Sequence, residues 1–217
     1  MSTNPLPSTP APSSPVWDNI YVSKSEQDRS WTQEAPIEAL KYISEMDLAH
    51  QTPIVDVGGG SSHLIQELLA RDFADLTVLD ISSKALEEAI ARINASGLSS
   101  ADVEWVVSDI RAWNPTRSYG LWHDRAVFHF LVTSEDQRIY VEKASKYIAA
   151  GGHLLIGTFA PDGPEMCSGM PVQRWSPEGL AEAFSASFTV IDAKQTLHET
   201  PFGHTQPFTW IHLIRNG

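Results

Sequence analysis

The stretch IVDVGGGSSHLIQELL, from Ile54 to Leu69, decides the fold that we predict for this chain. Its opening residues are mostly aliphatic and predict a short buried strand, while Leu64–Leu69 carries apolar side chains at helical spacing. Three glycines join the two segments, and a tight turn from a strand into a helix needs glycine for steric reasons alone. The stretch therefore predicts a strand, a glycine turn and a helix before any ligand is considered.

The same alternation of strands and helices continues along the chain. Apolar runs predict further strands at Leu76–Ile81, Val103–Val107, Gly120–Asp124, His153–Thr158, Phe188–Asp192 and Phe208–Ile214. Helices are expected at Pro36–Asp47, after Ser82 or Ser83, from about Ser134, and after Ser176. Such alternation predicts an α/β fold in which helices cover both faces of a mostly parallel sheet.

Composition divides the chain into three parts. Residues 1–15 are mostly Ser, Thr, Pro and Ala, which predicts a disordered tail because there is too little apolar surface to offset the entropy of ordering. Residues 16–50 hold the first predicted helix and an N-terminal segment that a family resemblance, given below, implies to be a lid. Residues 51–217 are expected to form one ligand-binding domain, in keeping with the total length of 217 residues.

The net charge of −12 argues against several classes of partner. A field of that sign repels nucleic acids and anionic membrane surfaces, so neither is expected as a partner. The chain shows no apolar run of the ~20 residues that a membrane span needs, and its start does not resemble a secretion signal. The single cysteine, Cys167, suits a reducing compartment. We therefore expect a cytoplasmic protein that is a monomer or a homodimer.

The residues that follow each predicted strand are the candidates for ligand binding, because ligands of parallel sheets bind beyond the carboxyl ends of the strands. Asp80 stands ~20 residues beyond the glycines, where a carboxylate accepts both hydroxyls of a ribose. The two features together fit a nicotinamide dinucleotide or S-adenosylmethionine. The dinucleotide fingerprint has a third glycine where this chain has His63, so the dinucleotide fits poorly.

S-adenosylmethionine fits these positions better. Asp56 stands just before the glycine turn, where a carboxylate can meet the ammonium group of the ligand, and Asp109 is placed to accept from the adenine amino group. The expected cofactor-binding residues on the sheet are the glycines, the strand-end carboxylates and their neighbours: Asp56, Gly58, Gly59, Gly60, Asp80, Ile81, Asp109, Ile110 and His123.

The segments DVGGGSS, VLDIS, SDI and AAGGHLLIGTF resemble the successive motifs of class I S-adenosylmethionine-dependent methyltransferases. Two longer strings, WHDRAVFHFL (Trp122–Leu131) and TFAPDGPEMCSGMPV (Thr158–Val172), resemble a subgroup of small bacterial-type members whose substrates are mostly unassigned. The resemblance covers residues 16–217. It implies a Rossmann-like sheet of seven strands with an antiparallel C-terminal strand, S-adenosylmethionine as cofactor and S-adenosylhomocysteine as its product.

The N-terminal arm and the aromatic-Asp-Arg run after the fourth strand are also similar to thiopurine and related thiol methyltransferases. This likeness implies that Trp17 and Trp31 fold over the cofactor, where an aromatic face beside the sulfonium contributes ~0.5–2 kcal/mol. Packing in the core is the alternative for each tryptophan.

The implied reaction is in-line attack of a nucleophile on the sulfonium methyl group. A thiolate needs little acid–base help, whereas an amine or a hydroxyl needs a base, for which Asp124, His123 and His129 are the candidates. Arg125 is expected either to contact the substrate or to pair with Asp124. The candidate catalytic residues are therefore Asp124, His129 and Arg125.

The candidate substrate-binding residues lie around the same end of the sheet. Phe128 is expected in a pocket wall, and the loop after the fifth strand offers Asp162, Cys167 and Arg174. Cys167 has no sign of activation in its sequence context, so packing is expected for it rather than a nucleophilic role. The spacings of the histidines match no metal-binding pattern, so no metal is expected.

Three functions remain open at this point. The first is methyl transfer to a small-molecule acceptor, with a thiol or an inorganic chalcogenide expected, because no extra domain or basic groove is present to hold a macromolecule. The second is protein-lysine methylation, since the WDNIY opening also resembles enzymes that modify translation factors. The third is a cofactor-binding module without chemistry.

Overall fold

Seven strands form the central sheet of the computed structural model, which describes residues 12–217. The strands are Ile54–Val57 (β1), Leu76–Asp80 (β2), Val103–Val107 (β3), Tyr119–Arg125 (β4), Ile148–Phe159 (β5), Phe188–Glu199 (β8) and Thr205–Arg215 (β9). Their order across the sheet is β3-β2-β1-β4-β5-β9-β8. The first five pair in parallel, and β9 runs antiparallel to both β5 and β8. The predicted α/β fold with an antiparallel C-terminal strand is confirmed.

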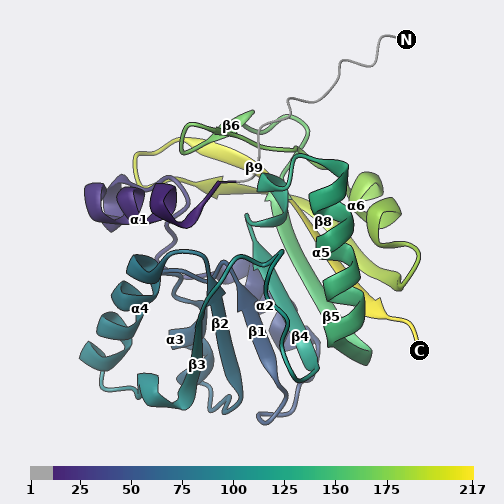
Figure 1. Ribbon diagram of the computed structural model, residues 1–217, viewed down its shortest axis with the longest axis horizontal. Helices are drawn as coiled ribbons and strands as arrows, with labels where there is room; N and C mark the ends of the chain where they lie inside the picture. The colour runs from purple at the N-terminus through teal and green to yellow at the C-terminus, as the bar shows by residue number, and fades with distance from the viewer. Residues whose placement is uncertain (1–11) are drawn as a thin grey trace.

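Helices cover both faces of this sheet (Figure 1). One face is covered by α2 (Ile37–Glu45), α3 (Leu64–Leu69) and α4 (Ser83–Ala95), and the other by α5 (Ser134–Tyr147) and α6 (Pro177–Phe184). The Ser82 hydroxyl caps α4, because it accepts the N–H of Ala85 at 3.2 Å. The helix therefore begins where the sequence predicts.

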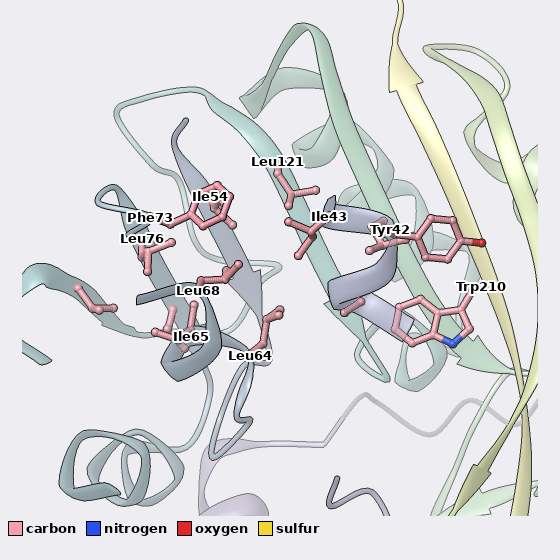
Figure 2. Packing of buried hydrophobic residues seen from close by; sticks show 14 of the residues in the cluster. Tyr42, Ile43, Ile54, Leu64, Ile65, Leu68, Phe73, Leu76, Leu121 and Trp210 are labelled. Atoms are coloured by element: carbon pink, nitrogen blue, oxygen red, sulfur yellow. The ribbon is translucent and has the colours of Figure 1, made fainter. Parts of the chain in front are cut away.

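The pleat of β1 divides the core between the two layers of helices. Ile54 packs with residues of α2 and α3 such as Ile43 and Leu64 (Figure 2), whereas Val55 and Val57 pack on the α5 side. A strand that is buried on both faces needs apolar side chains in both directions. This is why the strand is a nearly continuous apolar run in the sequence rather than an alternation of apolar and polar residues.

The N-terminal arm consists of α1 (Ser14–Ser23), a short 3₁₀ helix η1 (Glu26–Asp28) and the chain that leads to α2. Proline occupies the first turn of α1, where its missing N–H is tolerated. The disordered tail predicted over residues 1–15 is therefore wrong for its last two residues, and residues 1–11 lie outside the described part of the chain. The arm packs on α4 (Figure 1), where Asp18 accepts a hydrogen bond from the Ser82 hydroxyl at 2.7 Å.

Strand β8 continues to Glu199, well beyond the predicted end of this strand at Asp192. It lies at the edge of the sheet and most of its side chains are exposed or partly exposed, so an apolar pattern is missing from its second half. Antiparallel pairing with β9 holds it instead, from Phe188 opposite Arg215 to Glu199 opposite Thr205.

The loop after β5 folds into a small hairpin of β6 (Met166–Cys167) and β7 (Met170–Pro171). Its turn residues, Ser168 and Gly169, have φ angles of 52° and 77°, and two positive φ angles are what a tight hairpin turn of type I′ requires. The hairpin lies toward the same end of the molecule as α1 (Figure 1). Among the described residues, no helix combines the length and the apolar character needed to cross a membrane.

Gly157 in β5 leaves room for the ring of Trp210. A Cβ added there would lie 3.0 Å from three atoms of that ring, which is buried and stacked on His123. We expect Gly157→Ala to lower the free energy of unfolding by about 1–3 kcal/mol, because the ring has to shift within a packed core. Gly179→Ala in α6 is the matched control and should be neutral or stabilising, since alanine favours a helix. Urea denaturation measures both, and equal effects would contradict the packing argument.

Candidate active site

A cavity of about 150 Å³ lies beyond the carboxyl ends of β1, β2, β3 and β4 and beneath the N-terminal arm. Its walls combine strand-end residues such as Asp80 and Asp109 with arm residues such as Trp17 and Trp31. Every residue predicted to bind the cofactor lines this cavity except Gly60, which packs against the carboxylate of Asp80. The structure therefore brings together strand ends and an arm that the sequence predicts separately.

The glycine turn lets the backbone approach this cavity closely. Gly58 has a φ of +66°, and a Cβ there would lie 2.0 Å from Cγ2 of Val127. A Cβ at Gly59 would lie 2.7 Å from Oδ2 of Asp56, and one at Gly60 would lie 2.9 Å from Oδ2 of Asp80. Any side chain in the turn would therefore displace a residue of the cavity wall, which explains the three glycines.

Asp56 and His123 form a buried pair in the cavity wall. Oδ1 of Asp56 lies 2.7 Å from Nδ1 of His123, and each side chain is almost fully buried. The imidazole also stacks on Trp210, with ring centroids 6.1 Å apart, which holds the plane of the ring. Oδ2 of Asp56 and Nε2 of His123 have no hydrogen-bond partner among residues 12–217. The pair thus has one carboxylate oxygen and one ring nitrogen left for a ligand.

Asp80 is buried at the end of β2, beside the hydroxyl of Tyr21 from the arm. Its Oδ1 accepts the N–H of Ser82 at 2.7 Å. Burial raises the pKa of Asp80 to about 7, and the charge of Asp56 adds to this effect. A buried acid with a strongly raised pKa beside a cavity is typical of a functional site.

Asp109 lines the cavity at the end of β3, but Arg111 already holds its carboxylate. Nη2 of Arg111 lies 2.5 Å from Oδ2 of Asp109, and Nε donates to Oδ1 at 3.0 Å. Burial works to raise the pKa of Asp109, but the hydrogen bonds from Arg111 outweigh it and lower the pKa. A contact between Asp109 and adenine would have to use a lone pair that Arg111 leaves free.

Arg29 ties the arm to the glycine turn. Its guanidinium is 2% exposed, donates to Oγ of Ser61 at 3.1 Å and lies over the ring of Tyr21 at 4.4 Å. It also donates to both carboxylate oxygens of Glu88, at 2.8 and 2.7 Å. The arm is therefore held closed over the cofactor side of the cavity by a buried charge-assisted network.

The arm is held on its other side by residues of the sheet. Nη1 of Arg125 donates to the carbonyl of Trp31 at 2.8 Å, and Nε2 of His198 lies 2.7 Å from the carbonyl of Ser30. Trp17 packs edge-on against Trp31, with ring centroids 6.0 Å apart. The two tryptophans line the cavity and pack against the core at the same time, so the two roles weighed for them are compatible.

Asp124 does not line the cavity, and its prediction as a catalytic base is corrected. Neighbouring residues of a strand point to opposite faces, and Asp124 points to the α5 side. Its carboxylate accepts the Tyr140 hydroxyl at 2.6 Å and the N–H groups of Val127 and Phe128 at 2.9 and 3.1 Å. Burial raises its pKa to about 6. The side chain secures the turn after β4, and the alternative ion pair with Arg125 does not form in the described structure.

His129 and Phe128 lie in the core rather than in the cavity wall. Burial, and then the charge of Arg125, lowers the pKa of His129 to about 3, so its ring is neutral. The ring packs on Phe130 and Phe159, with centroid distances of 4.5 and 4.7 Å. Phe128 is fully buried among aromatic side chains of α5 and α6. The catalytic prediction for His129 and the substrate-binding prediction for Phe128 are therefore corrected.

Of the three loop residues predicted to bind the substrate, only Cys167 lines the cavity. Asp162 is exposed, and Arg174 is held by its own loop through Glu165 at 3.1 Å and the carbonyl of Gly163 at 3.3 Å. These two predictions are corrected because neither side chain lines the cavity. Burial raises the pKa of Cys167 to about 11, which keeps the thiol protonated and suits a packing role.

Among the residues of the site that sequence reasoning missed are Tyr21, Arg29 and Ser61. Tyr21 lies four residues after Trp17 and so on the same face of α1, a spacing that is visible in the sequence. The roles of Arg29 and Ser61 appear only when the arm meets the glycine turn. Within residues 12–217, no group of three or more His, Cys, Asp and Glu side chains is arranged to hold a metal ion.

Comparison with known proteins places this geometry in a family. Residues 54–152 match the family described as "Methyltransferase domain". Nodulation protein S of Rhizobium tropici is 28% identical over 147 residues, which are 65% of this chain and 60% of that protein. The ubiquinone biosynthesis O-methyltransferase of Pectobacterium atrosepticum is 26% identical over 66% of this chain and 62% of its own length. The chain thus spans about three fifths of the length of these two relatives.

A relative of another kind and two solved structures complete the comparison. EEF1A lysine methyltransferase 2 of Danio rerio is 21% identical over 81% of this chain and 74% of its own length. N-methyltransferase NodS from Bradyrhizobium japonicum WM9, in complex with S-adenosylhomocysteine, superposes with a TM-score of 0.66 at 16% identity, over 92% of this chain and all of the NodS chain. The methyltransferase match over residues 54–152 and these relatives support a class I S-adenosylmethionine-dependent methyltransferase. A structure described as "Conversion of a Disulfide Bond into a Thioacetal Group during Echinomycin Biosynthesis" shares the fold of this chain, with a TM-score of 0.74 at 18% identity over 94% of this chain and 93% of its own.

The residues of the cavity fit S-adenosylmethionine, the cofactor of this family. The unpaired, buried Oδ2 of Asp56 is suited to an ammonium group, since a buried carboxylate oxygen otherwise lacks a donor. Asp80 lies at the end of the second strand, where its carboxylate is suited to accept hydrogen bonds from the ribose hydroxyls. The glycine turn provides the close backbone approach, and the tryptophans of the arm provide aromatic faces for a sulfonium.

Asp80→Asn tests the buried carboxyl group through pH. The pKa of about 7 exceeds the ordinary value of 3.8, so the folded state favours the protonated form of Asp80. The stability that this preference contributes is complete below pH 3.8 and is lost as the pH rises through about 7. We expect the wild type to lose a few kcal/mol of unfolding free energy relative to Asp80→Asn across this window. Urea denaturation at a series of pH values measures it, with the exposed Asp162→Asn as control. Parallel profiles of wild type and Asp80→Asn would refute the assignment.

Trypsin cleavage after Lys24 tests whether the arm acts as a lid. Lys24 is exposed between α1 and η1, so cleavage there reports the opening of the arm. We expect saturating S-adenosylhomocysteine to slow this cleavage several-fold, because contacts with the two tryptophans stabilise the closed arm. Cleavage after Arg117, in an exposed loop between β3 and β4, is the internal control and should not change. Unchanged cleavage after Lys24 would count against a lid.

Proposed function

We propose that this protein transfers the methyl group of S-adenosylmethionine to a small-molecule acceptor, with a compact thiol as the preferred class. The observation that carries the proposal is the enclosure of the cavity between the strand ends and the docked arm. The acceptor end, near Trp31, Phe130 and Cys167, is walled by apolar and neutral side chains together with the single guanidinium of Arg125. An enclosed end of this kind suits a small molecule, and the net charge of −12 opposes nucleic acid as a substrate.

The chemistry follows from the residues that face the cavity. When bound, S-adenosylmethionine supplies a methyl group activated by the positive charge on sulfur. The walls of the cavity align the acceptor with that carbon and exclude water. A bond forms between the acceptor atom and the methyl carbon, the bond from that carbon to sulfur breaks, and the acceptor proton passes to Nε2 of His123. Asp56 orients the imidazole through Nδ1 and stabilises the imidazolium that results.

The limited supply of bases favours a thiol over a hydroxyl or an amine. Asp124 and His129 are directed away from the cavity. His63 also lines the cavity, but its Nε2 lies 2.9 Å from Oε1 of Glu26, so we assign the role of base to His123, whose Nε2 has no partner in the described part of the chain. A thiol ionises near pH ~8.5 and an alkyl ammonium near ~10.4, so one imidazole is sufficient for the first and less so for the second. The description of the echinomycin structure names a sulfur-containing substrate on the same fold, which agrees with this preference.

Lysine methylation is the second candidate function. It is favoured by EEF1A lysine methyltransferase 2, which aligns with 81% of this chain. A lysine side chain would enter the cavity as a long, flexible alkyl ammonium. An acidic protein surface attracts basic targets, which would assist such a substrate.

The test is incubation with labelled S-adenosylmethionine and a panel of sulfide, small thiols, phenols, amines and lysine peptides. We expect label in thiols, and we expect His123→Asn to lower kcat by about 10²-fold at neutral pH because the base is lost. This loss should shrink as the pH rises and thiols ionise by themselves, whereas a structural role of His123 would give a loss independent of pH. Asparagine keeps a donor for Asp56, and the exposed His204→Asn is the matched control.

The outcomes of this panel separate the candidates. Label in lysine peptides alone would replace a small molecule by a protein substrate. Binding of S-adenosylhomocysteine by calorimetry without transfer to any class would favour a cofactor-binding module. Failure to bind that nucleoside would remove the whole proposal.

A further inference from the structure

Arg125 presents an unpaired positive charge at the acceptor end of the cavity. Its Nη1 donates to the carbonyl of Trp31 at 2.8 Å, and Nη2 is buried with no hydrogen-bond partner in the described part of the chain. The residue lines the cavity and ends β4, two residues after His123. A buried guanidinium with an unused N–H₂ group lowers the free energy of unfolding unless a ligand binds that group.

The surroundings of the guanidinium do not compensate its charge. It lies over the ring of Phe208 at 4.9 Å, and an aromatic ring carries no net charge. The neighbouring Cys167 is a protonated thiol, and burial lowers the pKa of His129 to about 3 and that of His198 to about 4, so both rings are neutral. The charge of Asp56 raises the pKa of Arg125 by the smallest of the effects that act on it, and Oδ1 of Asp56 is occupied by His123.

The position of Arg125 separates it from the cofactor residues. Asp80 and Asp109 end β2 and β3, on one side of β1, whereas Arg125 ends β4 on the other side. Its contacts come from β9 and from the arm, and its charge is felt by residues of β6 and β8. The arm carries Trp17 and Trp31, which are predicted to lie beside the sulfonium, and none of these elements carries a residue assigned to adenine or ribose. We therefore place Arg125 beyond the sulfonium, at the acceptor end.

We propose that Arg125 binds an anionic group of the methyl acceptor, so that the substrates are compact thiols that carry a carboxylate or a group of the same charge. The inference rests on the proposed function and specifies its substrate class. The Nη2 group provides the hydrogen bonds, and the neutral walls around it keep the ion pair in a region of low dielectric, where it is strong. The carboxylate of the cofactor itself is the other source of such a group.

The experiment titrates matched pairs of thiols into the protein saturated with S-adenosylhomocysteine, so that binding is measured without turnover. The pairs are 3-sulfanylpropanoate with 3-sulfanylpropanamide, and 4-sulfanylbenzoate with 4-sulfanylbenzamide. We expect at least one acid to bind tenfold or more tightly than its amide. Arg125→Gln should abolish this preference, Arg125→Lys should keep part of it, and Arg174→Gln, which changes an arginine outside the cavity, should keep all of it.

The same titrations identify each way of failing. No preference for the acid in either pair, or a preference that survives in Arg125→Gln, would overturn the proposal. A loss of S-adenosylhomocysteine affinity in Arg125→Gln as large as the loss for the acid would overturn it as well, since it would assign the arginine to the carboxylate of the cofactor. Absence of S-adenosylhomocysteine binding to the wild type is a separate result, which defeats the proposed function itself. Thermal denaturation checks that the Gln and Lys variants fold.

Discussion

The register of β1 against β4 is the constraint on which the site depends. It sets Asp56 directly opposite His123, which brings their side chains to 2.7 Å at the carboxyl ends of both strands. Side chains of a strand alternate between its faces, so His123 and Arg125 point to the cavity while Asp124 between them points to α5. A slip of one residue would put a carboxylate in place of the imidazole and turn the arginine into the core. The chemistry of the cavity is therefore decided by the pleat of one central strand.

The same pleat explains how far the sequence could predict the site. The ends of β1 and β2 are visible as the points where apolar runs meet glycine or aspartate, because those signals are local, and the sequence therefore predicts that Asp56 and Asp80 lie at strand ends. The phase of the alternation in β4 is not visible, since a strand buried on both faces is apolar in both directions. For Asp124 the deciding partner is Tyr140, which lies on a helix that the sequence predicts but does not orient. The arrangement of consecutive polar residues therefore needed the tertiary structure.

The arm connects the two ends of the cavity mechanically. Arg29 fastens it near the glycine turn, while Arg125 and His198 fasten its later part to β4 and β8 through backbone carbonyls. Because carbonyl contacts do not depend on the side chains of Ser30 and Trp31, the arm sequence gives no sign of them. An arm that opens as the proposed lid would break the contacts on both sides of the cavity together, so it would expose and close the two ends of the cavity as a unit.

The distribution of charge within the cavity agrees with the chemistry of methyl transfer. Carboxylates lie at Asp56 and Asp80, where we propose that the cofactor binds, and the uncompensated cation of Arg125 lies where we propose that the acceptor binds. Attack of a thiolate on a sulfonium removes one negative and one positive charge, so the transition state is less charged than the reactants. Water solvates the separated ions better than the partly neutralised transition state, and its exclusion by the arm therefore favours the reaction. Such a site binds both ions through fixed opposite charges and then encloses them. The burial that encloses the ions is the same burial that raises the pKa of Asp80 and lowers that of Arg125.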